Sequence, residues 1–274
     1  MLLNLKEILE IAQQKKIAVG SFNTPNMTSI KAVISAAEEL NQPVIIMHAQ
    51  IHEEMGLCKI EEIAPVMLLF AKAANVPVCV HLDHGTDLDY VKRGIELGFT
   101  SVMYDGSALE KEENIKNTKV IVGEAHKHNV SVEAEIGSMG AREGGEGNAA
   151  SIYTEPDEAA AFVEQTGIDA LACAFGTAHG IYTSQPKLDF ERLSKIKSLV
   201  NVPLVMHGGS GIKDSDYREV IKRGISKVNY YTYMAKAGAE AVSQKKYTQF
   251  HDVLTDAENA MRENVKKAIK VFSE

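Results

Sequence analysis

The chain has 274 residues, a formal net charge of −8 and a hydrophobic fraction of 45%. This length is ample for a full hydrophobic core, and the composition is ordinary for a globular protein. The acidic balance argues against binding to nucleic acid or to a membrane surface. It does not exclude a phosphorylated ligand, because a metal or local dipoles can outweigh a distant net charge.

The compartment expected for this chain is the cytoplasm. The N-terminus does not read as a signal peptide, because Glu7 and Glu10 interrupt it and no small-residue cleavage site follows. No apolar run reaches the length of a transmembrane helix. The three cysteines have no paired spacing. Cys79 and Cys173 lie in apolar, strand-like runs, which predicts buried free thiols.

The predicted elements begin with a surface helix near the N-terminus, whose apolar residues share one face. That face contains Leu5, Ile8, Leu9 and Ala12. Eight short β-rich runs follow, and segments with helical spacing of apolar residues separate them. The runs begin at Ile17, Val44, Val78, Ser101, Val130, Ala170, Pro203 and Lys227.

Eight β/α units with no linker between them predict one domain, a (β/α)8 TIM barrel over residues 1–274. An open, doubly wound sheet is the alternative, but it more often has fewer strands, and no G-x-G-x-x-G follows the first run. In a barrel, functional residues are expected at the carboxyl ends of the strands and in the loops that follow them.

Three histidines stand at such positions. His84 follows the third run, His179 follows the sixth and His207 ends the seventh, each beside a glycine. A single histidine at a strand end is more often structural, but three at one rim predict a zinc site with an open fourth position. They are the predicted metal ligands.

Asp83 precedes the first of these histidines. His81, Asp83 and His84 cannot all face one ion from a regular strand, because neighbouring side chains point to opposite faces. Asp83 or His84 must therefore belong to the loop. A carboxylate beside a metal ligand acts as a general acid/base or orients the ligand, and the alternative role for Asp83 is a helix N-cap.

Further carboxylates end the fifth and fourth runs. Glu133 and Glu135 share one face by the period of two, and Asp105 is expected beside them. Unpaired carboxylates inside a barrel are costly, so a cation, Lys or Arg should lie near them. We favour a second metal position, and a salt-bridge network is the alternative.

Two glycine-rich segments follow strands at the same rim. Residues 137–151 carry Glu143 and Glu146 and predict a mobile lid. The segment after His207 offers backbone N–H groups and Ser210 to an anion, as the loops after strands seven and eight of TIM barrels often do. Asn229 and Thr232, which close the eighth run, complete this predicted phosphate cradle.

Taken together, HLDHG, VEAEIG, FGTAHGIY, MHGGSG and KVNYYT resemble the class II fructose-bisphosphate/tagatose-bisphosphate aldolase family, in its order and spacing over nearly the whole chain. The resemblance implies a zinc-dependent aldolase of carbohydrate metabolism, with glycolysis as one setting. Its substrate would be a fructose- or tagatose-1,6-bisphosphate type of ketose, split into dihydroxyacetone phosphate and an aldehyde such as glyceraldehyde 3-phosphate. A homodimer or homotetramer is expected.

The resemblance also implies roles for particular residues. His84, His179 and His207 match the zinc ligands, and Asp83 and Glu143 match the acid/base residues. A second divalent cation would lie at Asp105 and Glu135, with His81 nearby, and Na⁺ or K⁺ near Gly180 and Gly208. The residues that match the dihydroxyacetone phosphate site are Gly180, Gly208, Gly209, Ser210, Asn229 and Thr232.

Some positions depart from the family pattern. Thr183 stands where a Lys near the phosphate is often found, Ala49 replaces a small Ser, and Tyr230 and Tyr231 replace smaller or acidic residues. The C-terminal segment has no Arg at the position that would reach the distal phosphate, and Arg262 lies further on. The aldehyde end of the site therefore departs more than the dihydroxyacetone phosphate end.

Three other functions stay open. The chain could be a related class II aldolase that acts on a ketose 1-phosphate or another sugar phosphate. It could be a non-catalytic sugar-phosphate binder, which Ala49 and Thr183 favour and Asp83 opposes. A zinc hydrolase on the same fold more often has an H-x-H pair on its first strand, and GSFNTPN has none.

Overall fold

The computed structural model describes residues 1–137, 153–182 and 184–274. Eight parallel strands of this part close into a barrel, because β9 pairs with β2 and β4 pairs with β5. The predicted TIM barrel is confirmed, and the open-sheet alternative is wrong. The strands are β2 (Val19–Asn23), β3 (Val44–Ala49), β4 (Val78–Gly85), β5 (Ser101–Tyr104), β6 (Ser131–Ile136), β7 (Ala170–Cys173), β8 (Leu204–Met206) and β9 (Ile225–Tyr230).

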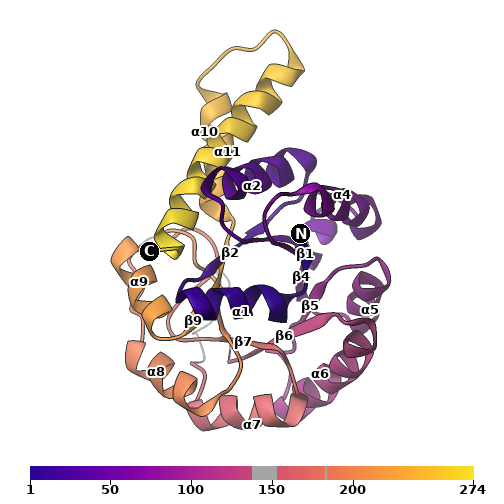
Figure 1. Ribbon diagram of the computed structural model, residues 1–274, viewed down its shortest axis with the longest axis vertical. Coiled ribbons are helices and arrows are strands. Elements are labelled where there is room, and N and C mark those ends of the chain that lie inside the picture. The colour runs from indigo at the N-terminus through magenta and orange to yellow at the C-terminus, as the bar shows by residue number, and fades with distance from the viewer. Residues whose placement is uncertain (138–152, 183) are drawn as a thin grey trace.

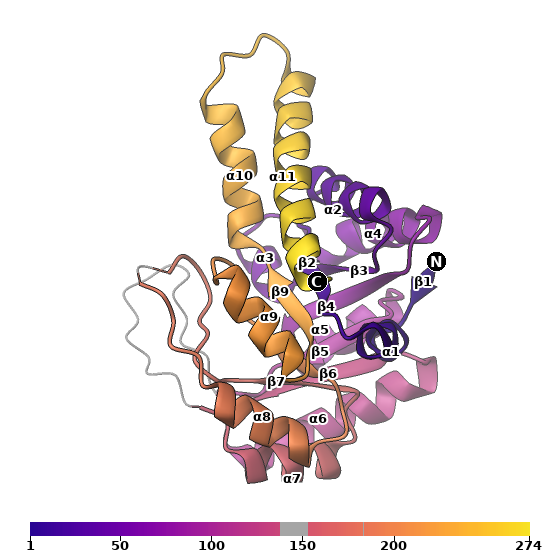
Figure 2. The same cartoon turned by 60° about the vertical axis from the view of Figure 1, so that its left-hand side comes forward.

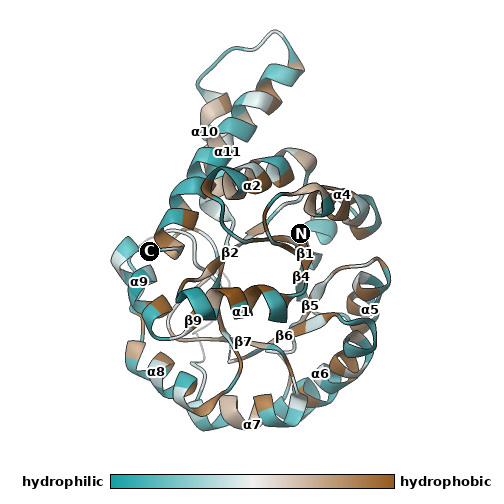
Figure 3. Cartoon of the chain, viewed as in Figure 1, coloured by the Kyte–Doolittle hydropathy of each residue, from teal (hydrophilic) through white to brown (hydrophobic). Residues whose placement is uncertain are grey.

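Helices surround the barrel (Figure 1). They are α2 (Met27–Leu40), α3 (Gln50–Glu54), α4 (Ile60–Ala73), α5 (Leu88–Glu96), α6 (Lys111–Ala125), the short η1 (His126–His128), α7 (Pro156–Thr166), α8 (Phe190–Leu199), α9 (Asp214–Lys222), α10 (Thr232–Ser243) and α11 (Phe250–Phe272). Helices α10 and α11 form a hairpin that projects from the barrel, and the base of α11 lies along α2 (Figure 2). Hydrophilic residues dominate the outward sides of the surrounding helices (Figure 3).

Helix α1 (Leu5–Lys15) closes the N-terminal end of the barrel, after the two-residue strand β1 (Leu2–Leu3) has paired with the start of β4. It begins at Asn4, whose side chain accepts a hydrogen bond from the Glu7 backbone N–H in a capping box. All four residues of the predicted apolar face are buried against Ile45, Cys79 and other residues inside the barrel. The expected helix is confirmed, and it lies across the end of the barrel (Figure 1), where its apolar face is buried.

We expect Leu9→Ala to lower the free energy of unfolding by about 2–5 kcal/mol, because it leaves a cavity in this closed end. Leu9 is 0% exposed. The exposed neighbour Glu10 is the control, and Glu10→Ala should change stability by about 0.5 kcal/mol or less. Urea unfolding of both variants measures the difference. Equal stabilities would mean that α1 does not fold together with the barrel.

Cys79 and Cys173 are buried free thiols inside β4 and β7, as predicted. The third cysteine, Cys58, is also free and is half-buried. Among the described residues, no helix is both long enough and apolar enough to cross a membrane.

Candidate functional site

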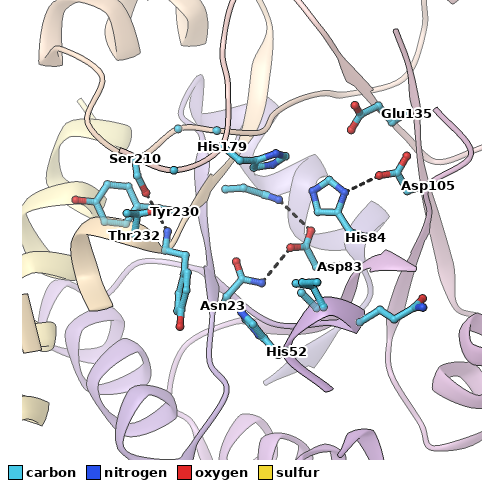
Figure 4. A pocket seen from close by; sticks show the side chains of 18 of the residues that line it. Asn23, His52, Asp83, His84, Asp105, Glu135, His179, Ser210, Tyr230 and Thr232 are labelled. Atoms are coloured by element: carbon cyan, nitrogen blue, oxygen red, sulfur yellow. Dashed lines mark hydrogen bonds and ion pairs between the residues drawn. The ribbon is translucent and has the colours of Figure 1, made fainter. Parts of the chain in front are cut away.

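A pocket of about 440 Å³ opens at the carboxyl ends of the strands, where a barrel is expected to carry its functional residues (Figure 4). Asn23 ends β2, Ala49 ends β3 and Glu135 lies near the end of β6, and all three line this pocket. The loop after β8 and the start of α10 form the opposite wall. One cavity therefore collects residues that lie far apart in the sequence.

The end of β4 departs from regular strand geometry. His84 has a φ of 47°, in the left-handed region that residues other than glycine rarely adopt, and the pairing with β5 shifts register between Leu82 and Gly85. Asp83 still pairs with Ala49 in the regular ladder. This irregularity lets both Asp83 and His84 line the pocket, which a regular strand would not allow.

The three predicted histidines converge. The nitrogens that His84, His179 and His207 would offer a metal lie within 4.8 Å of one another, and the rings of His84 and His207 have centroids 4.5 Å apart. His84 Nδ1 donates to Asp105 Oδ2 at 2.7 Å, and His207 Nε2 donates to Glu133 Oε1 at 2.8 Å. The imidazoles of His84 and His207 are thus each held by a carboxylate on one nitrogen.

The second nitrogen of each of these rings is buried. Within the described part of the chain, His84 Nε2 and His207 Nδ1 have no hydrogen-bond partner. A buried polar atom without a partner is rare, and a metal ion would satisfy both of these nitrogens. The donor set and its carboxylate partners therefore fit a divalent metal, with His179 as the third ligand.

Electrostatics at the pocket also favour a cation. Burial by itself would lower the pKa of His84, but Asp83 and Asp105 outweigh it and raise that pKa to about 10. Burial and the neighbouring His84 lower the pKa of His179 to about 3. The carboxylates around His84 thus stabilise one positive charge at the position where the metal would lie.

Asp105 and Glu135 lie beside His84, one of the three predicted metal ligands. Together with His84 they form a second group whose possible ligand atoms lie within 4.8 Å of one another. Asp105 accepts hydrogen bonds from His84 and from the Ser107 side chain. Burial, and to a smaller extent the nearby Asp105 carboxylate, hold the pKa of Glu135 well above its ordinary value.

Asp83 is buried between two amide groups. Asn23 Nδ2 donates to its Oδ2 and Asn229 Nδ2 donates to its Oδ1, both at 3.0 Å (Figure 4). Burial would raise the pKa of Asp83, but His84 and the other nearby positive charges hold it well below the ordinary value. Helix α5 is capped by Asp87, which accepts from the Tyr90 backbone N–H, so the N-cap alternative for Asp83 is wrong.

Asn23 and Lys227 also belong to this site, and neither of them was predicted from the sequence. The cation expected near Glu133 is Lys227, whose Nζ lies 2.9 Å from Glu133 Oε2 in a fully buried ion pair. Lys227 and Asn229 stand two residues apart on β9, so they point to the same face of the strand. That spacing was a usable signal, whereas Asn23 lay in a run without any distinctive pattern.

The loop after His207 lines the other wall of the pocket. Gly208 has a φ of 62°, and a Cβ at this position would lie 2.5 Å from the Ala178 carbonyl oxygen, so only glycine fits. The Gly209 N–H donates to the Asn229 carbonyl and is therefore not free for an anion. Ser210 Oγ accepts from the Tyr231 N–H at 3.0 Å and keeps its own hydrogen to donate.

All six residues expected at the phosphate end line this one pocket. They are Gly180, Gly208, Gly209, Ser210, Asn229 and Thr232. Thr232 is the first residue of α10, so the start of that helix faces the pocket. The Asn229 side chain is engaged by Asp83 and Lys227, which indicates a part in holding Asp83.

Four other residues singled out in the sequence are not among the described residues that line this pocket. Glu143, Glu146 and Thr183 lie outside the described residues. Arg262 lies on α11 with its Nε 3.3 Å from Glu39 Oε1 of α2, and it does not line the pocket. Among the described residues that do line it, none is Lys or Arg.

Comparisons with known proteins agree with this arrangement. A family model described as fructose-bisphosphate aldolase class-II matches residues 3–274. A protein of Escherichia coli strain K12, described as uncharacterized protein YdjI, is 39% identical over 262 residues, which cover 95% of this chain and 94% of that protein. The chain belongs to the class II fructose-bisphosphate aldolase family.

Solved structures share the fold. The crystal structure of the YdjI aldolase from Escherichia coli K12 matches with a TM-score of 0.90 and 37% identity, covering 99% of this chain and 97% of that one. Fructose-bisphosphate aldolase from Campylobacter jejuni matches with a TM-score of 0.83 over 99% and 95% of the two chains. At 24% identity, that second likeness supports the fold alone.

Proposed function

We propose that this protein is a zinc-dependent aldolase that reversibly cleaves a phosphorylated ketose to dihydroxyacetone phosphate and an aldehyde. The observation that carries the proposal is the convergence of three histidines on one point beside the buried Asp83. Bound there, zinc would act as a Lewis acid on the ketose oxygens and stabilise the negative charge that develops next to the carbonyl group.

Residues of the chain would supply the rest of the reaction. Asp83, kept ionised by the positive charges around it and aligned by Asn23 and Asn229, would take the proton from the hydroxyl group beside the bond that breaks. The Ser210 hydroxyl and the start of α10 would hold the phosphate of dihydroxyacetone phosphate. This anchoring would orient the substrate over the metal.

Several finer features belong to the same proposal. We expect a second cation position at Asp105 and Glu135, and a Na⁺ or K⁺ site near Gly180 and Gly208. A homodimer or homotetramer in the cytoplasm is expected as well. Metal analysis and sedimentation of the purified protein would test these expectations.

A direct assay tests the proposed function. The purified protein, loaded with zinc, is incubated with fructose and tagatose phosphates, and triose phosphate release is followed through a coupled reductase. Release of dihydroxyacetone phosphate supports an aldolase. If no ketose phosphate is cleaved although one binds, the non-catalytic binder is the better description. Release of inorganic phosphate alone would indicate a hydrolase.

We expect a ketose 1-phosphate to be cleaved at a rate within about tenfold of the corresponding bisphosphate, a difference of roughly 1.4 kcal/mol or less. The reason is that none of the described residues lining the pocket is Lys or Arg, and that Arg262 pairs with Glu39. Steady-state kinetics with fructose 1-phosphate and fructose 1,6-bisphosphate measure this ratio. A bisphosphate preference of about a thousandfold, roughly 4 kcal/mol, would show that a cation reaches the distal phosphate.

Glu143 is proposed to move the proton on the dihydroxyacetone phosphate carbon. We expect Glu143→Ala to slow exchange of that proton with solvent by roughly 10²–10⁴-fold, the usual range for a positioned acid/base, without changing the zinc content. Exchange is followed by NMR in deuterated buffer. Glu146→Ala is the matched control, three residues further along. If Glu146→Ala slows exchange and Glu143→Ala does not, the two roles are reversed.

A further inference from the structure

Lys227 is a buried cation at the centre of the site. Its side chain is 0% exposed and lies inside the barrel on β9. Its Nζ donates to Glu133 Oε1 at 3.2 Å and to Asn229 Oδ1 at 2.8 Å. Glu133 continues to His207, and Asn229 continues to Asp83. One ammonium group therefore joins a predicted metal ligand to the predicted acid/base.

The direction of each hydrogen bond in this chain of contacts follows from which groups can donate and which can only accept. A lysine ammonium group only donates, so the atom of Asn229 that faces it must be the amide oxygen. The Asn229 NH₂ group then has to point the other way, toward Asp83. Without the lysine, the amide could turn over and present its oxygen to the Asp83 carboxylate, which is repulsive.

The same argument holds on the other side of Lys227. Glu133 lies between two donors, with Oε2 2.9 Å from Lys227 Nζ and Oε1 2.8 Å from His207 Nε2, and a carboxylate paired with a lysine ammonium group only accepts. His207 Nε2 must therefore carry a hydrogen, which leaves the lone pair on Nδ1. His207 Nδ1 is a buried nitrogen without a hydrogen-bond partner among the described residues, and Glu135 Oε2, which also has none, lies 3.4 Å from it.

We propose that Lys227 is a positioning residue that fixes hydrogen-bond polarity in both directions, so that His207 presents Nδ1 to the metal and Asn229 presents its N–H to Asp83. The inference rests on the proposed function, because it assumes a metal at the histidines and a base at Asp83. The alternative is that Lys227 only neutralises Glu133, as buried ion pairs commonly do.

Three variants separate these roles. Lys227→Met leaves Glu133 as an unpaired buried charge, so it is expected to be unstable. Lys227→Met/Glu133→Gln removes both charges at similar volume and should restore the melting temperature.

Glu133→Gln alone is the matched control: there Lys227 would hold the amide oxygen and turn the NH₂ group toward His207 Nε2. If Lys227 is a positioning residue, this single variant binds zinc about 10–100-fold more weakly than the double variant, whereas equal binding indicates charge neutralisation alone. The kcat of Glu133→Gln is also about 10–100-fold lower than that of the double variant, whereas KM changes little.

A spectroscopic measurement follows the His207 side without any substrate. The visible absorption of cobalt-loaded Glu133→Gln should differ from that of the cobalt-loaded double variant, because only the single variant turns an NH₂ group toward His207 Nε2. The same metal affinity, cobalt spectrum and kcat in the two variants would overturn the proposal and leave only charge neutralisation.

Asn229→Asp follows the Asp83 side and remains informative if the double variant does not fold. It keeps an oxygen toward Lys227 but replaces the N–H toward Asp83 by a second oxygen. We expect kcat to fall about 100-fold, the lower range for a positioned acid/base, with unchanged zinc affinity. Wild-type kcat in this variant would overturn the Asp83 half of the proposal.

The metal titrations also keep the two proposals apart. If the wild-type protein cleaves no ketose phosphate, the proposed function fails. Weaker zinc binding in Glu133→Gln than in the double variant would then still support the positioning role of Lys227, and equal binding would remove it.

Discussion

Asp83→Ala is expected to lower kcat for ketose phosphate cleavage by roughly 10⁴-fold, the upper end of the range for a positioned acid/base, while zinc stays bound. The large effect follows from the surroundings of the carboxylate. Asp83 is 3% exposed, accepts one N–H from each of two amide groups and has a pKa well below its ordinary value. It is therefore a base across the neutral range, and no other described carboxylate is held in this way in the pocket.

The measurement combines steady-state kinetics with metal analysis of the same preparation. Asp87→Asn is a matched control, because Asp87 lies four residues away, is exposed, and Asn caps a helix about as well as Asp. The control should keep wild-type kcat. Loss of zinc in Asp83→Ala would mean that Asp83 supports the metal, and a kcat near the wild-type value would transfer the proton step to another group.

Removal of the metal is expected to abolish cleavage altogether, and His207→Ala is expected to have the same effect. With one of three ligands missing, zinc content should fall from about one ion per chain to near zero, because His84 and His179 alone do not form the usual three-ligand site. Chelation of the wild-type protein should remove activity, and added zinc or cobalt should restore it. In His207→Ala, added zinc should not.

His128→Ala is the control for this experiment. His128 is an exposed imidazole in η1 that lies near Glu124, and its replacement should change neither zinc content nor activity. Full activity of a metal-free wild-type preparation would refute metal-dependent cleavage. Normal zinc content in His207→Ala would mean that the ion is held instead by the second group, formed by His84, Asp105 and Glu135.

The outline of the fold could be predicted because it depends on local patterns. Alternating β-rich and helical segments recur eight times, and the closed barrel is the arrangement that covers such a sheet on all sides. The apolar face of α1 was also readable from its spacing, although its position in the end of the barrel was not. The spacing of apolar residues along one element shows that a face is buried, but it does not show which part of the protein packs against that face.

The three histidines could be predicted for a related reason. Parallel strands of a barrel end at one rim, so residues at their carboxyl ends converge whatever the details of register. That rule alone predicts that His84, His179 and His207 lie together. It also placed the loop after His207 near the start of α10.

The sequence by itself therefore determined the barrel, the rim that carries the site and the residue types available for chemistry there. Only the tertiary structure decided the left-handed turn at His84 and the contacts of Asp83 with Asn23 and Asn229, which lie 60 and 146 residues away along the chain. The same holds for the ion pair between Lys227 and Glu133. Such contacts depend on the register between strands and on how far each side chain reaches across the barrel. The periodicity of a single strand determines neither of these.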